Sequence, residues 1–311
     1  MKKIIGILSV LILGLLLTGC GKNEPLQKNN KLVVYTSFYT MADFTKKIGG
    51  DKVEVINLLP PGVEAHDWEP TTTDITKLEK AKILIYSGSG MEHWVGKVTS
   101  TLQNKDLILV ETSKKVPLIT RSSTNDGHGH DQKGDSPQMD PHVWLSPLNA
   151  KIQLKAIQEG LTKADPANAE YYEKNYQKYA KELDELDQEL KAMLLPLKKK
   201  EIIVSHAAFG YLCDAYGLEQ EAIRGLSPDE EPNPARMKDL ILFAKEHQVK
   251  VIFFEEMVNP KVSEAIAREV GAEVMRLNPL ENLTEKEIQQ GDDYISVMRR
   301  NGQSIQKALM K

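Results

Sequence analysis

Short apolar runs alternate along the chain with segments of helical periodicity, and this alternation limits the possible folds more than any other feature. In the first half we expect strands at 32–35, 53–58, 83–86 and 107–110, with helices at 41–48, 74–80 and 91–102. In the second half we expect strands at 202–205, 249–254 and 273–277, with helices at 207–215, 233–247, 260–270 and 284–309. Such alternation builds parallel sheets with helices on both faces, so we predict an α/β fold with two Rossmann-like lobes. The sequence shows no internal repeat.

A long helical segment separates the two series. Asp165 and Pro166 predict its start, because Asp is a good N-cap and Pro suits the first helical position, and the pattern continues to Pro196. An apolar stripe marks one side of it, formed by Leu183, Leu186, Leu190 and Leu194. About 30 residues in a helix span roughly 45 Å. We therefore expect one rigid helix between two lobes, with the helix at 165–197 and the lobes at 32–164 and 198–311. A coiled-coil seam is the alternative, although one stripe of this length is short for it.

The first twenty residues have the pattern of an export signal. Lys2 and Lys3 precede an apolar run at 4–17, which is shorter than the roughly 20 residues of a membrane span. The tetrapeptide at 17–20, Leu-Thr-Gly-Cys, resembles the lipobox of bacterial lipoproteins, in which the cysteine takes the lipid. We predict a signal peptide at 1–19, lipidation of Cys20, a tether at 20–31, and anchoring to the outer face of the cell membrane. An ordinary signal peptide that contains a cysteine is the alternative.

The net charge and the cysteine count limit the binding partners and the disulfides that we expect. Removal of the signal leaves 292 residues with a formal charge of −6, and such a mildly acidic chain argues against a nucleic-acid partner. After Cys20 the chain has only Cys213, so we expect no internal disulfide. We expect a monomer.

Four potential metal ligands lie near the ends of predicted strands or the start of a helix. His66 follows the second strand, and His142 precedes a helix that begins at 146–147. His206 and Glu281 each follow a strand of the second lobe. Because ligands bind at the carboxyl edge of parallel sheets, a cleft can gather two of these side chains from each lobe. Three neutral imidazoles and one carboxylate suit tetrahedral zinc, whereas manganese prefers more oxygen. Each histidine taken alone is also consistent with a structural role.

Four motifs resemble the zinc-type solute-binding proteins of ABC transporters, the ZnuA/AdcA group of cluster A-I. They are His-Asp-Trp-Glu-Pro at 66–70, Pro-His-Val-Trp-Leu-Ser-Pro at 141–147, Ser-His-Ala-Ala-Phe-Gly-Tyr at 205–211 and Gly-Leu-Ser-Pro-Asp-Glu-Glu-Pro at 225–232. The resemblance covers essentially the whole mature chain. It implies two α/β lobes, a rigid linking helix and a metal held between the lobes.

By position, the resemblance implies that the three imidazole ligands are His66, His142 and His206. Glu281 matches the glutamate that some zinc members use as fourth ligand, although a water can replace it. Related proteins often carry Asp at the position of Asn278, but Asn is a poor metal ligand. Manganese relatives tend to carry Glu in place of His206, and this difference favours zinc.

A low-complexity segment at 121–138 is rich in Ser, Asp, Gly, His and Gln, and we expect a mobile loop there. Zinc members of the family often have a His-rich acidic loop at this point, thought to capture or sense the metal. His128 and His130 are therefore candidates for an auxiliary metal loop. A solvated linker is the alternative.

Acidic residues near the histidines are candidates for a supporting role. Asp140, Glu255 and Glu256 are placed where a carboxylate can accept a hydrogen bond from the second ring nitrogen of a ligand histidine. Glu255 and Glu256 are equally consistent with acids at the start of a helix.

The resemblance implies a binding protein and not an enzyme. Its expected role is to capture Zn²⁺, as the transported ligand, and deliver it to an ABC permease. The alternatives are a manganese-specific protein of the same family, a secreted zinc hydrolase and a surface adhesin. A hydrolase is disfavoured because four protein ligands leave zinc no open position and no His-Glu-x-x-His helix exists. Nothing in the sequence encodes an adhesive surface.

Overall fold

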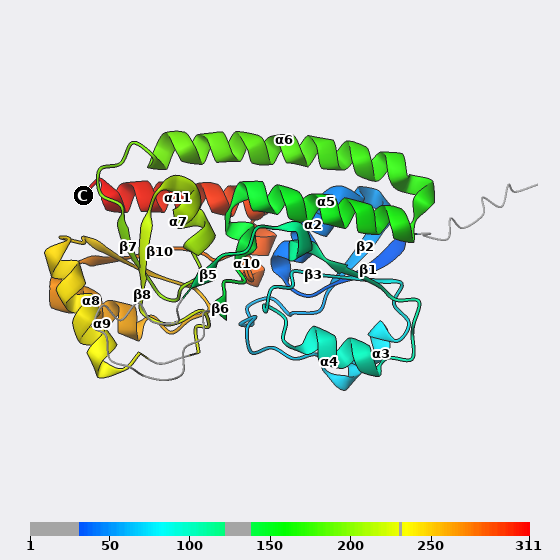
Figure 1. Cartoon of the computed structure of the whole chain (residues 1–311), viewed down its shortest axis with the longest axis horizontal. Coiled ribbons are helices and arrows are strands. Elements are labelled where there is room, and N and C mark those ends of the chain that lie inside the picture. Colours follow the sequence, from blue (N-terminus) through cyan, green and yellow to red (C-terminus); the bar gives the residue numbers. More distant parts are fainter. Residues whose placement is uncertain (1–30, 122–137, 230–231) are drawn as a thin grey trace, which may run out of the picture. The chain divides into compact units, whose positions relative to one another are not determined.

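Two four-stranded parallel sheets organise the chain and share one strand order (Figure 1). The computed structural model describes residues 31–121, 138–229 and 232–311. The N-terminal lobe has the order β2-β1-β3-β4, from β1 (Leu32–Thr36), β2 (Val53–Asn57), β3 (Ile83–Tyr86) and β4 (Ile108–Glu111). The C-terminal lobe has the order β8-β7-β9-β10, from β7 (Glu201–Val204), β8 (Glu219–Ala222), β9 (Val251–Phe254) and β10 (Glu273–Arg276). The predicted α/β class is confirmed, and the lobes repeat one topology that no repeat in the sequence reveals.

Helices cover both faces of each sheet (Figure 1). The N-terminal lobe has α2 (Tyr39–Gly49) and α5 (Pro147–Ala164) on one face and α3 (Thr72–Leu78) and α4 (Trp94–Thr101) on the other. The C-terminal lobe has α7 (Gly210–Tyr216) and α11 (Tyr294–Leu309) on one face and α8 (Pro234–Glu246) and α9 (Lys261–Val270) on the other. Inner strands such as β3 are apolar on both faces because helices cover both, and successive side chains point to opposite faces. Ile83 and Ile85 enter one core, while Leu84 between them enters another.

The expected linking helix is confirmed as α6 (Ala169–Leu194), which packs on α2 and α5 of one lobe and on α7 and α11 of the other. Its 26 residues span about 39 Å. The leucine stripe is buried in a core that both lobes share, so this helix is packed against each of them. Asp165 is the N-cap and Pro166 the first residue, as expected, but the expectation that the first turn is α-helical is wrong. A 3₁₀ turn, η4 (Pro166–Asn168), comes first, and the Asp165 carboxylate accepts hydrogen bonds from Asn168 Nδ2 and Tyr172 OH, both at 2.7 Å.

The expected single helix at 284–309 is also wrong. It is two helices, α10 (Glu285–Gln289) and α11, separated by a turn in which Gly291 has a φ of 81°. Asp293 then caps α11 by accepting a hydrogen bond from Ser296 N at 2.8 Å. Residues 289–293 carry no apolar side chain, and the left-handed glycine and the new cap end one helix and begin the next.

Two sheet elements were not expected from the sequence. Strand β8 is polar, because it lies at the edge of its sheet. The antiparallel pair β5 (Thr120–Arg121) and β6 (Gln138–Met139) brackets the low-complexity segment.

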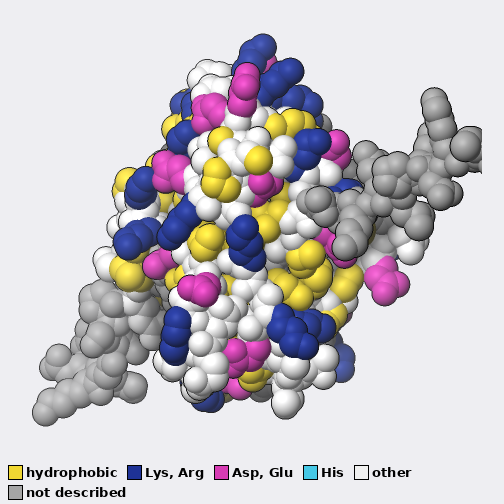
Figure 2. Space-filling view, turned by 90° about the vertical axis from the view of Figure 1, so that its right-hand side faces the viewer, with side chains coloured by type: hydrophobic (Ala, Val, Ile, Leu, Met, Phe, Trp, Pro, Cys, Tyr) yellow, Lys and Arg dark blue, Asp and Glu magenta, His cyan; other side chains and the backbone are white. Residues whose placement is uncertain are grey.

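Cys20, His128 and His130 lie outside the described residues, as does the predicted signal peptide. In the described ranges, no helix is both long and apolar enough to cross a bilayer. On the face shown in Figure 2, basic and acidic side chains are interspersed, and no large patch of one sign is visible. That face therefore resembles no nucleic-acid surface.

Candidate metal centre

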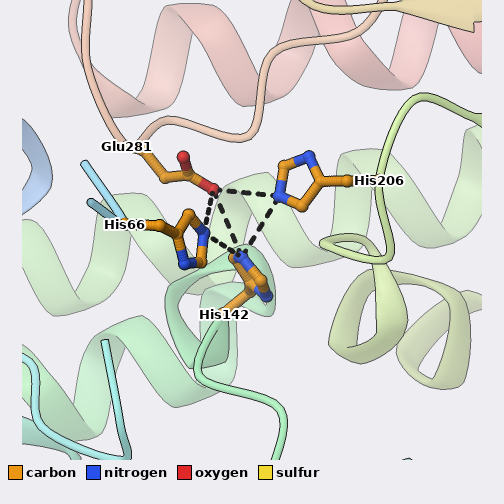
Figure 3. Close-up of side chains that lie close together, drawn as sticks. All are labelled: His66, His142, His206 and Glu281. Atoms are coloured by element: carbon orange, nitrogen blue, oxygen red, sulfur yellow. Dashed lines mark hydrogen bonds and ion pairs between the residues drawn. The ribbon is translucent and has the colours of Figure 1, made fainter. Parts of the chain in front are cut away.

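Four side chains from distant parts of the chain point at one another in the structure (Figure 3): His66, His142, His206 and Glu281. One ligand atom from each lies within 4.8 Å of all the others, and all four side chains are buried. The Nε2 atom of His142 lies 3.2 Å from that of His66 and 3.4 Å from that of His206. Oε1 of Glu281 lies 3.4 Å from the Nε2 atom of His66 and 3.2 Å from those of the other two histidines.

Five of the six separations among the ligand atoms match a tetrahedron of the size that zinc requires, and the sixth, between the Nε2 atoms of His66 and His206, is within 4.8 Å. In a regular tetrahedron the edge is about 1.63 times the distance from centre to vertex. Edges of 3.2–3.4 Å, as measured for five of the six, correspond to a distance of about 2.0–2.1 Å from centre to ligand atom, which is the usual zinc–nitrogen and zinc–oxygen distance.

Strand ends and their loops position the four residues. His206 stands two residues after β7, and Glu281 follows β10. His142 follows β6 and begins the 3₁₀ turn η3 (Val143–Leu145), while His66 lies in the loop after β2. The carboxyl edges of the two parallel sheets thus supply His66, His206 and Glu281, and the segment after the antiparallel pair supplies His142.

Two buried carboxylates set the orientation of two imidazoles. Oδ1 of Asp140 lies 2.8 Å from Nδ1 of His142 and accepts a hydrogen bond from the same residue's backbone N–H. Oε1 of Glu255 makes the same pair of contacts with His206, also at 2.8 Å from Nδ1. Because each carboxylate accepts the Nδ1 proton, the bare Nε2 faces the centre of the site. The sequence had suggested both roles. The third candidate, Glu256, lies instead against Arg276.

The electrostatics of the site favour a cation. Burial lowers the pKa of the His206 imidazole, but the charges and hydrogen bonds of Glu255 and Glu281 outweigh burial and raise that pKa well above its ordinary value. The pKa of His142 is also raised, because Asp140 and Glu281 outweigh its burial. Burial raises the pKa of Glu281, but the three histidines hold it well below its ordinary value. These shifts favour an ionised Glu281 and positive charge among the histidines, which is the charge pattern that a bound cation replaces.

Asn278 has a structural role, which explains why it is not among the converging side chains. Its Oδ1 accepts a hydrogen bond from Leu280 N at 2.7 Å, and this bond shapes the turn that presents Glu281. Leu280 has a φ of 61°, an uncommon left-handed conformation for leucine. Thr40 donates its hydroxyl hydrogen to the Leu280 carbonyl and so helps hold this turn.

Tyr211 is a supporting residue that sequence reasoning missed. Its hydroxyl donates to the carbonyl of Asp140 and accepts from Ile119 N, both at 3.1 Å. The last residue of the 205–211 motif thus ties the His206 segment to the residue that orients His142. No local pattern in the sequence signals this contact, because the partners are 71 and 92 residues away.

Two described histidines lie apart from the centre. His93 is exposed just before α4, and His247 follows α8, where it stacks on Phe243. No motif in the sequence assigns either of them to the site.

A buried set of three imidazoles and one carboxylate, held between two lobes with parallel sheets, defines a binding protein for a single metal cation. The family model named ZnuA, described as zinc-uptake complex component A, periplasmic, matches residues 34–308. The chain belongs to this family of zinc-uptake components. The expectation of a solute-binding protein, as opposed to an enzyme, is confirmed by this membership.

Similar proteins agree with this assignment. The chain is 41% identical to the high-affinity zinc uptake system protein ZnuA of Bacillus subtilis (strain 168), over 99% of this chain and 98% of that protein. It is 35% identical to the zinc-binding lipoprotein AdcA of Streptococcus pneumoniae (strain ATCC BAA-255 / R6), over 99% of this chain but only 61% of AdcA. The Zn(II)-bound ZnuA-like domain of Streptococcus pneumoniae AdcA has a solved structure with a TM-score of 0.76 and 34% identity. That match covers 90% of this chain and 100% of the domain.

Proposed function

We propose that this protein captures Zn²⁺ outside the cell, at His66, His142, His206 and Glu281, and delivers it to an ABC permease for import. The observation that carries the proposal is the convergence of three Nε2 atoms and one carboxylate oxygen, with five of their six separations at 3.2–3.4 Å and all of them within 4.8 Å. The names of the relatives, a zinc uptake protein and a zinc-binding lipoprotein, support it.

Zinc binding is coupled to the protonation of the histidines in the site. Zinc coordinates only neutral imidazoles, so it displaces protons from the raised-pKa histidines as it binds. The complex then carries a formal charge of +1, which the buried carboxylates Asp140 and Glu255 offset through the histidines. Four protein ligands close the coordination sphere, so no open position is left to activate water for hydrolysis.

Zinc is favoured over manganese by the donor set. Manganese suits oxygen ligands in an octahedral arrangement, whereas this site offers three nitrogens and one oxygen at tetrahedral separations.

We further propose the attachment that the sequence predicts. A signal peptide at 1–19 directs export, Cys20 carries the lipid, and residues 20–31 tether a monomeric protein to the outer face of the cell membrane. The lobes span 32–164 and 198–311, on either side of the helix at 165–197. His128 and His130 form an auxiliary metal loop. The order of charged, apolar and small residues at 1–20 supports the anchor, and the relative AdcA is named a lipoprotein.

A competitive titration tests the function. The protein is titrated with Zn²⁺ and Mn²⁺ against a chromogenic chelator, together with His206→Ala and the control His247→Ala. We expect preference for zinc, a loss of affinity of at least about 100-fold in His206→Ala, and unchanged binding in His247→Ala. Preference for manganese, or equal affinities in the two variants, would overturn the proposal.

A further inference from the structure

Asn282, next to Glu281, joins two loops that each carry a residue of the proposed zinc site. Its Nδ2 donates to the carbonyl of Pro60 at 2.7 Å and to that of Val63 at 2.8 Å. Its Oδ1 accepts from Leu283 N at 2.9 Å, and the side chain is buried. A backbone hydrogen bond from Gly62 N to Leu283 O, at 3.2 Å, joins the same two segments. Both amide hydrogens of Asn282 thus hold the Glu281 turn against the loop that leads to His66, while its side-chain carbonyl is bonded within the turn itself.

The segment that presents Glu281 changes lobes along its length. Up to Asn278 it belongs to the C-terminal lobe, because Asn301 of α11 bonds both the N–H and the carbonyl of Asn278. The carbonyls of the next two residues accept hydrogen bonds from the N-terminal lobe. Trp144 Nε1 donates to Pro279 O at 2.7 Å, and Thr40 donates to Leu280 O.

This attachment changes how the site is divided between the lobes. The sequence predicted two residues from each lobe. The hydrogen bonds of residues 279, 280 and 282, however, attach the Glu281 turn to the N-terminal lobe, which carries His66 and His142. His206 stays with the C-terminal sheet, where Glu255 binds it.

We propose that Asn282 is a positioning residue for the metal site. It fixes Glu281 against the His66 loop, so that three of the four ligands form one prearranged group to which His206 adds the fourth. The proposal rests on the proposed function above. Asn282 does not touch the metal position; it acts through Glu281.

The test compares Asn282→Ala with a control that loses similar hydrogen bonds elsewhere. Asn104 also donates its amide to two backbone carbonyls, at Ala81 (2.8 Å) and Leu78 (3.4 Å), far from the site. We expect Asn282→Ala to weaken zinc binding by about tenfold or more. We expect Asn104→Ala to leave it within about twofold of the unsubstituted protein.

Two further measurements separate positioning from a general loss of structure. In a Glu281→Ala background the effect of Asn282→Ala on zinc affinity should fall to within about twofold, because there is no carboxylate left to position. In a His206→Ala background its effect should persist. The visible spectrum of the Co²⁺-loaded variant should also lose the intense bands of four-coordinate cobalt, while that of Asn104→Ala should keep them.

The outcomes distinguish the two proposals. Failure of the unsubstituted protein to bind zinc would overturn the proposed function. Tight binding by the unsubstituted protein with equal binding by Asn282→Ala would overturn this inference alone. An undiminished effect of Asn282→Ala in the Glu281→Ala background would do the same.

Discussion

His206 and Glu255 stand at the ends of the neighbouring strands β7 and β9, and Nδ1 of His206 lies 2.8 Å from Oε1 of Glu255. The negative charge of Glu255 makes the imidazole more basic and fixes its orientation. Glu255→Gln keeps the shape but removes the charge, so we expect zinc affinity to fall by about 10–100-fold, measured by competitive titration. The control is Glu256→Gln, which alters the exposed neighbour and should leave affinity unchanged. Equal affinities in the two variants would show that Glu255 does not support the site.

Zinc binding should weaken in acid, starting above the pH at which an ordinary histidine becomes protonated. The pKa of His206 in the metal-free fold is raised well above 6.5, so protons compete with zinc already near neutral pH. The same raised pKa stabilises the metal-free fold below the pKa of the unfolded chain, and this stabilisation is lost as pH rises through the folded-state pKa.

Competition by protons and stabilisation of the metal-free fold by protons both make the zinc-induced rise in melting temperature smaller at lower pH. The rise should be large at about pH 8 and smaller at about pH 6, with each value taken against protein in a chelator. A rise that stays constant over this range would contradict the assignment of protonated histidines to the metal-free site.

Deletion of residues 125–136 should leave the affinity of the main site unchanged. All four converging residues lie outside this segment, and its flanks are joined by the pairing of Thr120 with Met139 and of Arg121 with Gln138. We therefore expect a dissociation constant within about twofold of that of the full chain, measured by competitive titration. A collapse of affinity would mean that the loop supplies a ligand to the main site.

Two helical glycines should respond to alanine with opposite signs. A Cβ on Gly302 of α11 would lie 2.4 Å from Cδ2 of the buried Leu190 on α6, whereas a Cβ on Gly96 of α4 would meet nothing within 4 Å. Gly302→Ala should lower the free energy of unfolding by about 1–3 kcal/mol through overpacking. Gly96→Ala should raise it by up to about 1 kcal/mol through helix propensity. Urea unfolding of metal-free protein measures both, and a stabilised Gly302→Ala would show that the helices move apart freely.

Most strands and helices were predictable from the sequence because their signals are local. Apolar runs such as Ile83–Tyr86 mark buried parallel strands, and the leucine stripe marks the buried side of α6. Errors occurred where a contact or a single backbone angle overrides periodicity. Examples are the edge strand β8, the break at Gly291 and the 3₁₀ turn before Ala169.

The sequence alone determined which residue types were available to hold a metal, and where each stands relative to a strand end. It also suggested the supporting carboxylates, because Asp140 is two residues from His142 and Glu255 directly follows a predicted strand. Only the tertiary structure decided that four side chains spread over more than 200 residues share one cavity, and that Glu281 is held by the lobe opposite to its own sheet. The physical reason is that periodicity and capping act over a few residues. The hydrogen bonds of Asn282 and Tyr211 join segments whose proximity depends on how the whole chain packs.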